Sequence, residues 1–321
     1  MATGTVICLG LLGYQLQSFS ANEGRLVQTD VSPAALAAAT SPGLTVSPSP
    51  SLSATPAPSV NSRSKTVSSK LLKAYAVPHN GLITNEYAFF NPHDPASVIS
   101  SDWEMTSGSL FGRDGAFWTG VPDENEPNAK STNATNSAVF RLDSRQKYAG
   151  NIRVSLALMQ LANIGNAGCN DNDTCWHGTH VWLRYQTEYN LYYASVNRAD
   201  GQVTIKRKVP CGDDNDGTYF VLGSYVPHSF KSGAWNHYQV TIQTNFDKSV
   251  TIKLYDANVS TTKPVTVGTD RGGTNPNWSK SCSTPGKYAS ARYTPITAAG
   301  GIGIRGDYAN FLFKDLTVSK L

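Results

Sequence analysis

The chain has 321 residues, of which 40% are hydrophobic and 16% are charged, and its formal net charge is +4. This length allows one large domain or two small ones. The low charged fraction and the many Gly, Ser, Thr and Asn residues favour an extracellular β-rich domain over a cytosolic helical enzyme. No Lys- or Arg-rich stripe is longer than a few residues, which excludes a basic nucleic-acid-binding surface.

The N-terminal part divides into two segments by composition. Residues 1–30 include the apolar run TVICLGLLGY, which has the length of the apolar part of a secretion signal and is too short to span a bilayer. No Lys or Arg precedes this run, so a tail without function is the alternative. Residues 31–74 are rich in Pro, Ser, Ala and Thr, and such a segment cannot bury enough apolar surface to fold. We therefore expect a leader over 1–30, an extended stalk over 31–74 and a folded domain over 75–321.

From residue 75 on, short segments with alternating apolar and polar residues follow one another. A period of two, with turns such as RADGQ and NFDKS between segments, is typical of antiparallel strands with one buried face. Two such sheets packed face to face form a sandwich, so the sequence predicts an all-β domain. The clearest segments are 151–159, 180–186, 191–197, 202–209, 235–243, 249–256, 301–305 and 310–318.

Alternation also assigns side chains to the two faces of each strand. In the segment 180–186, Val181, Leu183 and Tyr185 fall on the apolar face. The residues on the opposite faces combine rings, amides and cations. This combination binds sugars, because rings pack against the C–H side of a pyranose and planar polar groups bond its hydroxyls. We predict a face that binds a poly- or oligosaccharide, with cations that favour a carboxylate or sulfate. Its residues are His180, Trp182, Arg184, Tyr193, Asn197, Lys206 and His237.

Three segments of the chain resemble the concanavalin A-like jelly-roll superfamily. They are HVWLRYQTEYNLYYASVNRADGQVTIKRK, AWNHYQVTIQTN and AAGGIGIRGDYANFLFKDLTV. Within the superfamily they are most similar to secreted bacterial domains of the 3-keto-disaccharide hydrolase type and to laminin G-like modules. The resemblance covers about residues 80–321, with NEYAFFNP as an opening strand and WEMTSGSLFGRDG as a hairpin. It implies a two-sheet antiparallel jelly-roll sandwich.

The resemblance leaves the function open, because the superfamily contains lectins, glycosidases, lyases and structural modules. Its family 16 glycosidases carry Glu-x-Asp-x-x-Glu on one strand, and this chain has no such motif. A lyase needs a Tyr or His base beside Arg or Asn, and the predicted face contains these residue types. A glycoside hydrolase or lyase acting in the same groove is thus the second hypothesis. A non-catalytic adhesion or spacer module is the third, since solvated sheets also carry cross-strand aromatic and charged pairs.

Carboxylates raise the question of a structural calcium ion. The resemblance implies such an ion between the first and last strands, held by Glu86 with Asp307 or Asp315. The loops CNDNDTC and CGDDNDG also cluster oxygen ligands, but neither completes the calcium-loop pattern with a Glu. Ordinary polar turns fit the same loops equally well.

Four cysteines lie in polar, loop-like sequence. An even number in such loops favours two disulfides and an oxidising compartment, which agrees with a secreted or cell-surface location. Cys169 and Cys175 are close in sequence and would leave Cys211 to pair with Cys282, but the other connectivities remain open. A zinc site is the alternative hypothesis, but the sequence contains no C-x-x-C pair that such a site would use. The sequence does not show which oligomeric state the protein adopts.

Overall fold

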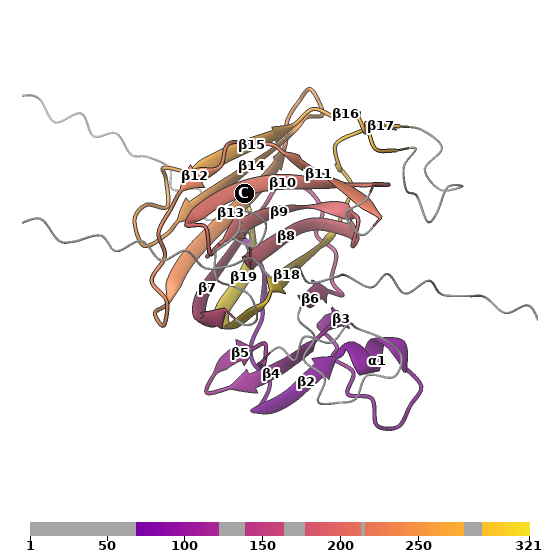
Figure 1. Cartoon of the computed structure of the whole chain (residues 1–321), viewed down its shortest axis with the longest axis vertical. Helices are drawn as coiled ribbons and strands as arrows, with labels where there is room; N and C mark the ends of the chain where they lie inside the picture. The colour runs from indigo at the N-terminus through magenta and orange to yellow at the C-terminus, as the bar shows by residue number, and fades with distance from the viewer. Residues whose placement is uncertain (1–68, 122–138, 164–176, 213–215, 279–290) are drawn as a thin grey trace, which may run out of the picture. The chain divides into compact units, whose positions relative to one another are not determined.

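The computed structural model describes residues 69–121, 139–163, 177–212, 216–278 and 291–321. Two antiparallel sheets packed against each other form most of this part of the chain (Figure 1). The prediction of an all-β, two-sheet jelly-roll sandwich is confirmed. Among these residues, no helix is long and apolar enough to cross a lipid bilayer.

The strand order of the first sheet is not the chain order. The sheet runs β15 (Thr266–Asp270), β14 (Val250–Asp256), β13 (Asn236–Thr244), β7 (Ile152–Asn163), β19 (Ala309–Lys320), β5 (Ala116–Trp118), β4 (Ser109–Arg113) and β2 (Gly81–Asn85), and β1 (Leu71–Ala74) also pairs with β19.

The second sheet contains most of the segments that the sequence assigned to the sugar-binding face. It runs β11 (Gly217–Val221), β10 (Gln202–Pro210), β9 (Asn190–Val196), β8 (Gly178–Thr187), β18 (Gly301–Asp307), β6 (Val139–Ser144) and β3 (Trp103–Ser107), with β12 (Val226–Pro227) paired to β10. A separate two-stranded ribbon joins β16 (Gly273–Thr274) and β17 (Arg292–Tyr293).

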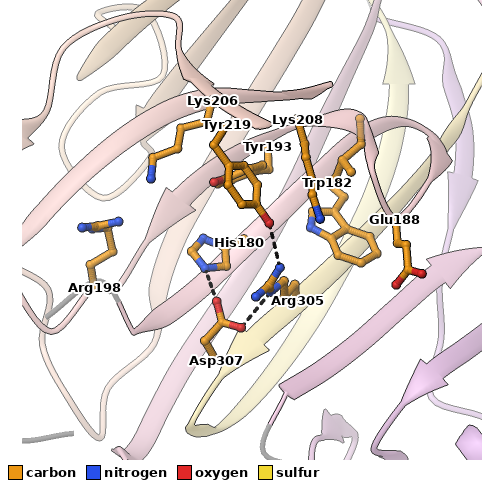
Figure 2. Close-up of a pocket in the computed structure, with 11 residues that line it drawn as sticks. His180, Trp182, Glu188, Tyr193, Arg198, Lys206, Lys208, Tyr219, Arg305 and Asp307 are labelled. Atoms are coloured by element: carbon orange, nitrogen blue, oxygen red, sulfur yellow. Dashed lines mark hydrogen bonds and ion pairs between the residues drawn. The ribbon is translucent and has the colours of Figure 1, made fainter. Parts of the chain in front are cut away.

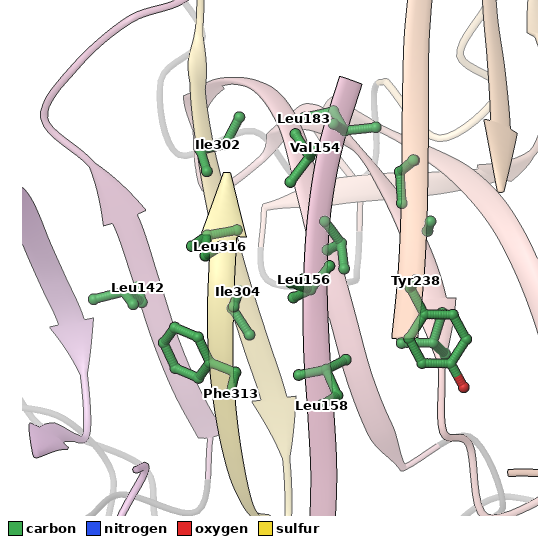
Figure 3. Packing of buried hydrophobic residues seen from close by; sticks show 14 of the residues in the cluster. Leu142, Val154, Leu156, Leu158, Leu183, Tyr238, Ile302, Ile304, Phe313 and Leu316 are labelled. Carbon is green, nitrogen blue, oxygen red and sulfur yellow. The ribbon is translucent and has the colours of Figure 1, made fainter. Parts of the chain in front are cut away.

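The core lies between the two sheets and consists of the residues that alternation predicted. On β7, Val154, Leu156 and Leu158 are at most 3% exposed, and Figure 3 shows them beside Phe313 of β19 and Ile304 of β18. Burying a side chain of this size stabilises a fold by about 1.5–3 kcal/mol. The two opposed apolar faces therefore hold the sandwich together.

Two local predictions near the start of the domain are wrong. The segment NEYAFFNP begins a short helix, α1 (Glu86–Phe90), because the Asn85 side chain caps it by accepting a hydrogen bond from the Ala88 N–H. The segment WEMTSGSLFGRDG is not one hairpin, because β3 pairs with β6 in the second sheet while β4 pairs with β2 and β5 in the first. The chain passes between the sheets at Gly108, whose φ of 83° favours glycine.

The folded domain begins earlier than residue 75. Strand β1, which the composition placed in the stalk, pairs with β19 from Leu71 to Ala74. Lys73 of β1 also forms an ion pair with Asp102, at 2.8 Å between Nζ and Oδ1. The leader and the rest of the stalk, up to residue 68, lie outside the described residues and stay predictions.

Candidate functional site

Two rows of directly opposed residues cross the second sheet on the face that points away from the core, here called the outer face. Opposed residues on paired strands point to the same side of a sheet, so each row brings its side chains together. The first row crosses from β10 to β3 as Lys206, Tyr193, Trp182, Gly303, Asp143 and Glu104. The second crosses from β10 to β6 as Thr204, Ser195, His180, Arg305 and Arg141.

Over β8 to β11 and β18, the outer face is hollowed into a cavity of about 320 Å³, here called the cationic cavity (Figure 2). Its volume lies at the lower end of the range of ~300–1,000 Å³ that is common for ligand pockets. Four of its lining residues are Lys or Arg and two are acidic, so positive charge dominates. The lining residues are His180, Trp182, Glu188, Leu191, Tyr193, Arg198, Lys206, Lys208, Tyr219, Arg305 and Asp307.

The floor of the cationic cavity contains a buried hydrogen-bonded network. His180 lies between Asp307, with 2.8 Å from Nε2 to Oδ2, and Ser195, with 2.8 Å from Nδ1 to Oγ. Arg305 donates from Nε to the other carboxylate oxygen of Asp307 at 2.7 Å. Burial alone would raise the pKa of Asp307, but the charge of Arg305 and the hydrogen bond from His180 hold it well below its usual range.

Ser195, His180 and Asp307 have the residue types of a hydrolytic triad but not its function. The carboxylate of Asp307 needs a donor, which assigns the proton of the imidazole to Nε2 and leaves Nδ1 to accept from the Ser195 hydroxyl. Burial lowers the pKa of His180, so the ring is neutral and both of its nitrogens are occupied. Ser195 itself is fully buried. The network therefore fixes the floor of the cavity and supplies no nucleophile.

Lys206 is a cation of this cavity that lies among tyrosine rings. Its Nζ lies 5.4 Å from the ring centre of Tyr225 and 6.0 Å from those of Tyr193 and Tyr219. No acidic side chain forms an ion pair with it in the part of the chain that the structure describes. By contrast, Arg198 is paired with Asp200. Lys206 is therefore the group best placed to receive an anion.

A bulge in β8 changes the predicted faces of that strand. Arg184 has a φ of 47°, and the register of β8 shifts between Leu183 and Thr187. One extra residue reverses the alternation beyond it. Arg184, predicted on the outer face, is therefore buried and donates to the carbonyls of Ile296 at 2.5 Å and Gly150 at 3.3 Å. Tyr185, predicted in the core, lies on the outer face.

Two further predicted ligand residues lie away from the cavity. Asn197 has a φ of 49° and is buried, and its Oδ1 accepts a hydrogen bond from the Tyr238 hydroxyl at 2.6 Å. His237 is exposed on β13 and thus belongs to the first sheet. Of the predicted set, the structure brings together His180, Trp182, Tyr193 and Lys206.

Sequence reasoning missed several residues of the cavity. Lys208 and Arg305 follow the same alternation as their predicted neighbours and could have been included. Tyr219 lies on a short strand without a clear pattern, so its place next to Lys206 depends on strand order. Asp307 was assigned to calcium and is instead paired with Arg305 and His180.

The residues proposed for calcium do not gather in one place. Glu86 is buried, and its Oε2 accepts from the Gly108 N–H at 2.5 Å, while Asp315 is exposed on β19. Within the described ranges, no group of three or more His, Cys, Asp or Glu side chains could hold a metal ion. The loop CNDNDTC and residues 213–215 of CGDDNDG lie outside these ranges. Cys211 is buried. Cys169, Cys175 and Cys282 lie outside the described residues, so the pairing of the four cysteines stays a prediction.

Comparison with known proteins gives likeness in fold only. No known protein family matches the chain, and no curated protein sequence matches it. A carbohydrate-binding module, CBM66 from Bacillus subtilis, is 12% identical with a TM-score of 0.41, over 69% of this chain and 99% of that one. The metal-free carbohydrate recognition domain of Emp46p is 13% identical with a TM-score of 0.42, over 77% and 98%. A legume lectin-like domain from Entamoeba histolytica is 10% identical with a TM-score of 0.36, over 68% and 90%. The chain's own topology, two antiparallel sheets packed around one core, is that of a jelly-roll sandwich.

Proposed function

We propose that the cationic cavity binds a sugar that carries a carboxylate or sulfate group, as part of a poly- or oligosaccharide. The observation that carries this proposal is Lys206, an ammonium group surrounded by three tyrosine rings and without an ion pair to any described carboxylate. A ligand anion would form a charge-assisted hydrogen bond with it, and such bonds are about twice as strong as neutral ones.

The rest of the cavity suits the neutral part of a sugar. Tyr193 and Tyr219 supply ring surface for the C–H side of a pyranose, and the Tyr219 hydroxyl accepts from Arg305 Nη1 at 3.2 Å. Because Arg305 is itself held by Asp307, these polar groups are positioned before a ligand arrives. A preorganised site loses less entropy on binding.

An exported location is part of the same proposal. Leader, stalk and loop cysteines each favour a secreted or cell-surface protein, where acidic polysaccharides are found as partners. Mass spectrometry without reduction should show two disulfides among the four cysteines of residues 75–321. Four free thiols in that segment would contradict the exported location.

The binding proposal is tested with the full chain and polysaccharides of known charge. Calorimetric titration should detect binding of polygalacturonate or chondroitin sulfate, weaker binding of a neutral galactan, and weaker binding of all acidic ligands at high ionic strength. Replacing Lys206→Gln should reduce affinity for the acidic ligand by about tenfold, the effect of one lost hydrogen bond to a charged group. The matched control is Lys263→Gln, at an exposed loop lysine. If the wild type binds no polysaccharide, the adhesion or spacer hypothesis replaces this one.

A further inference from the structure

A second cavity of about 490 Å³ lies on the same outer face, at the β6 and β3 side of the sheet. We call it the acidic cavity, since Glu104, Asp143 and Glu188 are among its lining residues. Glu188 lines both cavities. Trp182 lines the cationic cavity and Tyr185 lines the acidic cavity, and their rings stack on each other. The two cavities are thus neighbours along one row of residues.

Asp143 is an unusual group in the acidic cavity. Its side chain is only 9% exposed, and its Oδ1 atom is buried and accepts no hydrogen bond from the residues that the structure describes. A Cβ atom at position 301 would overlap this oxygen, so the space that it occupies exists because Gly301 has no side chain. An orphaned, buried carboxyl oxygen is costly unless a ligand or a proton satisfies it.

The charges around Asp143 do not offset its burial. Lys147 Nζ is 3.9 Å from Oδ2, which is too far for a hydrogen bond, and Arg145 acts at longer range. Glu104 opposes ionisation, while Arg141 and Glu188 of the same cavity pair with each other at 3.3 Å. Burial therefore raises the pKa of Asp143 to about 8, and the carboxyl group keeps its proton at neutral pH.

Glu104 is the second carboxyl group and differs from the first. It lies directly opposite Asp143, on β3 against β6. Its side chain is 41% exposed, and Arg145 Nη1 lies 3.3 Å from its Oε2. The Cβ atoms of directly opposed residues are ~4.5–5.5 Å apart. Side chains that start from neighbouring Cβ atoms can bring their carboxyl groups to the ~5–5.5 Å that retaining glycosidases use.

We propose that Asp143 and Glu104 hydrolyse a glycosidic bond in an oligosaccharide whose acidic sugar occupies the cationic cavity, which rests on the function proposed above. Asp143 gives its proton to the bridging oxygen while the Glu104 carboxylate attacks the anomeric carbon. The carbon–oxygen bond breaks, its electron pair stays with the departing sugar, and an ester to Glu104 forms. Asp143 then takes a proton from water, whose oxygen displaces Glu104. One water molecule is consumed, and both side chains return to their starting states.

The two cavities also define the length and direction of the substrate. Lys206 and Asp143 are four strand spacings apart in the first row, or about 19 Å at ~4.8 Å per spacing. One sugar ring cannot reach across both cavities. The substrate is therefore an oligosaccharide, with an acidic sugar over Lys206 and the bond to be cleaved over Asp143.

The test measures cleavage and binding separately on the full chain. Reducing ends released from polygalacturonate, alginate, chondroitin sulfate and heparan sulfate give the activity, and calorimetry gives the affinity. Wild type should cleave at least one of the four. Both Asp143→Asn and Glu104→Gln should lower this rate by about 10²-fold or more while affinity changes little. The matched control is Asp315→Asn, an exposed carboxylate of the first sheet at a φ that Asn accepts, and it should cleave normally.

A third variant separates chemistry from structure. Glu104→Ala should cleave the polysaccharide again when azide is added, because azide can enter the space left by the carboxylate and attack the anomeric carbon. The product is a glycosyl azide and not a reducing end, so mass spectrometry of the fragments is the readout. A merely structural Glu104 would show no such rescue. Because Glu104 is partly exposed, its variants should fold even if Asp143→Asn does not.

The outcomes distinguish the two proposals. Binding without cleavage of any of the four polysaccharides overturns the catalytic pair and leaves the cationic cavity as a binding site. Cleavage that persists in Glu104→Gln also overturns it. If the wild type cleaves a polysaccharide and Lys206→Gln does not change the affinity, the catalytic pair Asp143 and Glu104 is supported and the proposed function is contradicted. Neither binding nor cleavage contradicts both.

Discussion

Trp182 and Tyr185 lie parallel on the outer face, with ring centres 5.0 Å apart and planes 6° apart. The bulge at Arg184 makes this possible, because it returns the third residue after Trp182 to the same side of the strand. The stack leaves Trp182 only 3% exposed. This indole therefore contributes to the stability of the sheet as well as to the wall of the cationic cavity.

Replacing Trp182→Ala should consequently destabilise the domain by about 3–5 kcal/mol, the usual loss for a large buried aromatic side chain. The free energy of unfolding in urea is the measurement. His237→Ala, at an exposed position of the first sheet, is the control and should change it by no more than about 0.5 kcal/mol. Equal effects of the two changes would show that the stack does not form.

Removing Asp307 should leave Arg305 without its partner. Asp307→Ala is expected to lower the free energy of unfolding by about 3–5 kcal/mol, because a largely buried charge then remains uncompensated. The double variant Asp307→Ala with Arg305→Met should recover much of this loss. Chemical denaturation of the two single variants and the double variant gives the coupling energy. Additive effects would mean that the ion pair seen in the structure is not formed in solution.

The buried carboxyl group of Asp143 predicts a dependence of stability on pH. In the folded protein its pKa is about 8, against an ordinary value of 3.8. The folded state then holds one more proton than the unfolded state between these values, so this group lowers stability as pH rises from about 4 to about 8. Asp143→Asn should match the wild type near pH 4 and become more stable than it toward pH 8, by several kcal/mol at most. Unfolding curves at both pH values measure the difference, and a constant difference would show that Asp143 titrates normally.

Two deletions locate the start of the folded domain. Loss of residues 31–68 should leave the melting temperature unchanged, because a Pro- and Ser-rich stalk contributes no core. Loss of residues 31–74 removes β1 and the Lys73–Asp102 ion pair. This longer deletion should lower the melting temperature by at least a few degrees. Calorimetry on both chains gives the comparison. A large drop with the shorter deletion would mean that the stalk packs on the domain.

Strand existence and the core were predictable from the sequence, because alternation follows directly from the geometry of a strand. Val154, Leu156 and Leu158 are buried as expected. The error at Arg184 arose because a single bulged residue reverses the alternation and no pattern marks it in advance.

Strand order set the second limit on prediction. His237 has the right residue type, but its strand belongs to the other sheet. Asp143 and Glu104 escaped notice for the same reason, since only the pairing of β6 with β3 brings them together. Local pattern does not encode which strands become neighbours.

Strand β19 pairs with β7, β5 and β1, which all precede it by long stretches of sequence. β19 lies between β7 and β5, so the two halves of the first sheet cannot join until residues 309–320 have left the ribosome. Domains dominated by contacts between distant segments fold slowly, over milliseconds to seconds. Until β19 pairs with them, the edges of β7 and β5 are open to pairing with other chains, so the domain is most prone to aggregation before its last strand is in place.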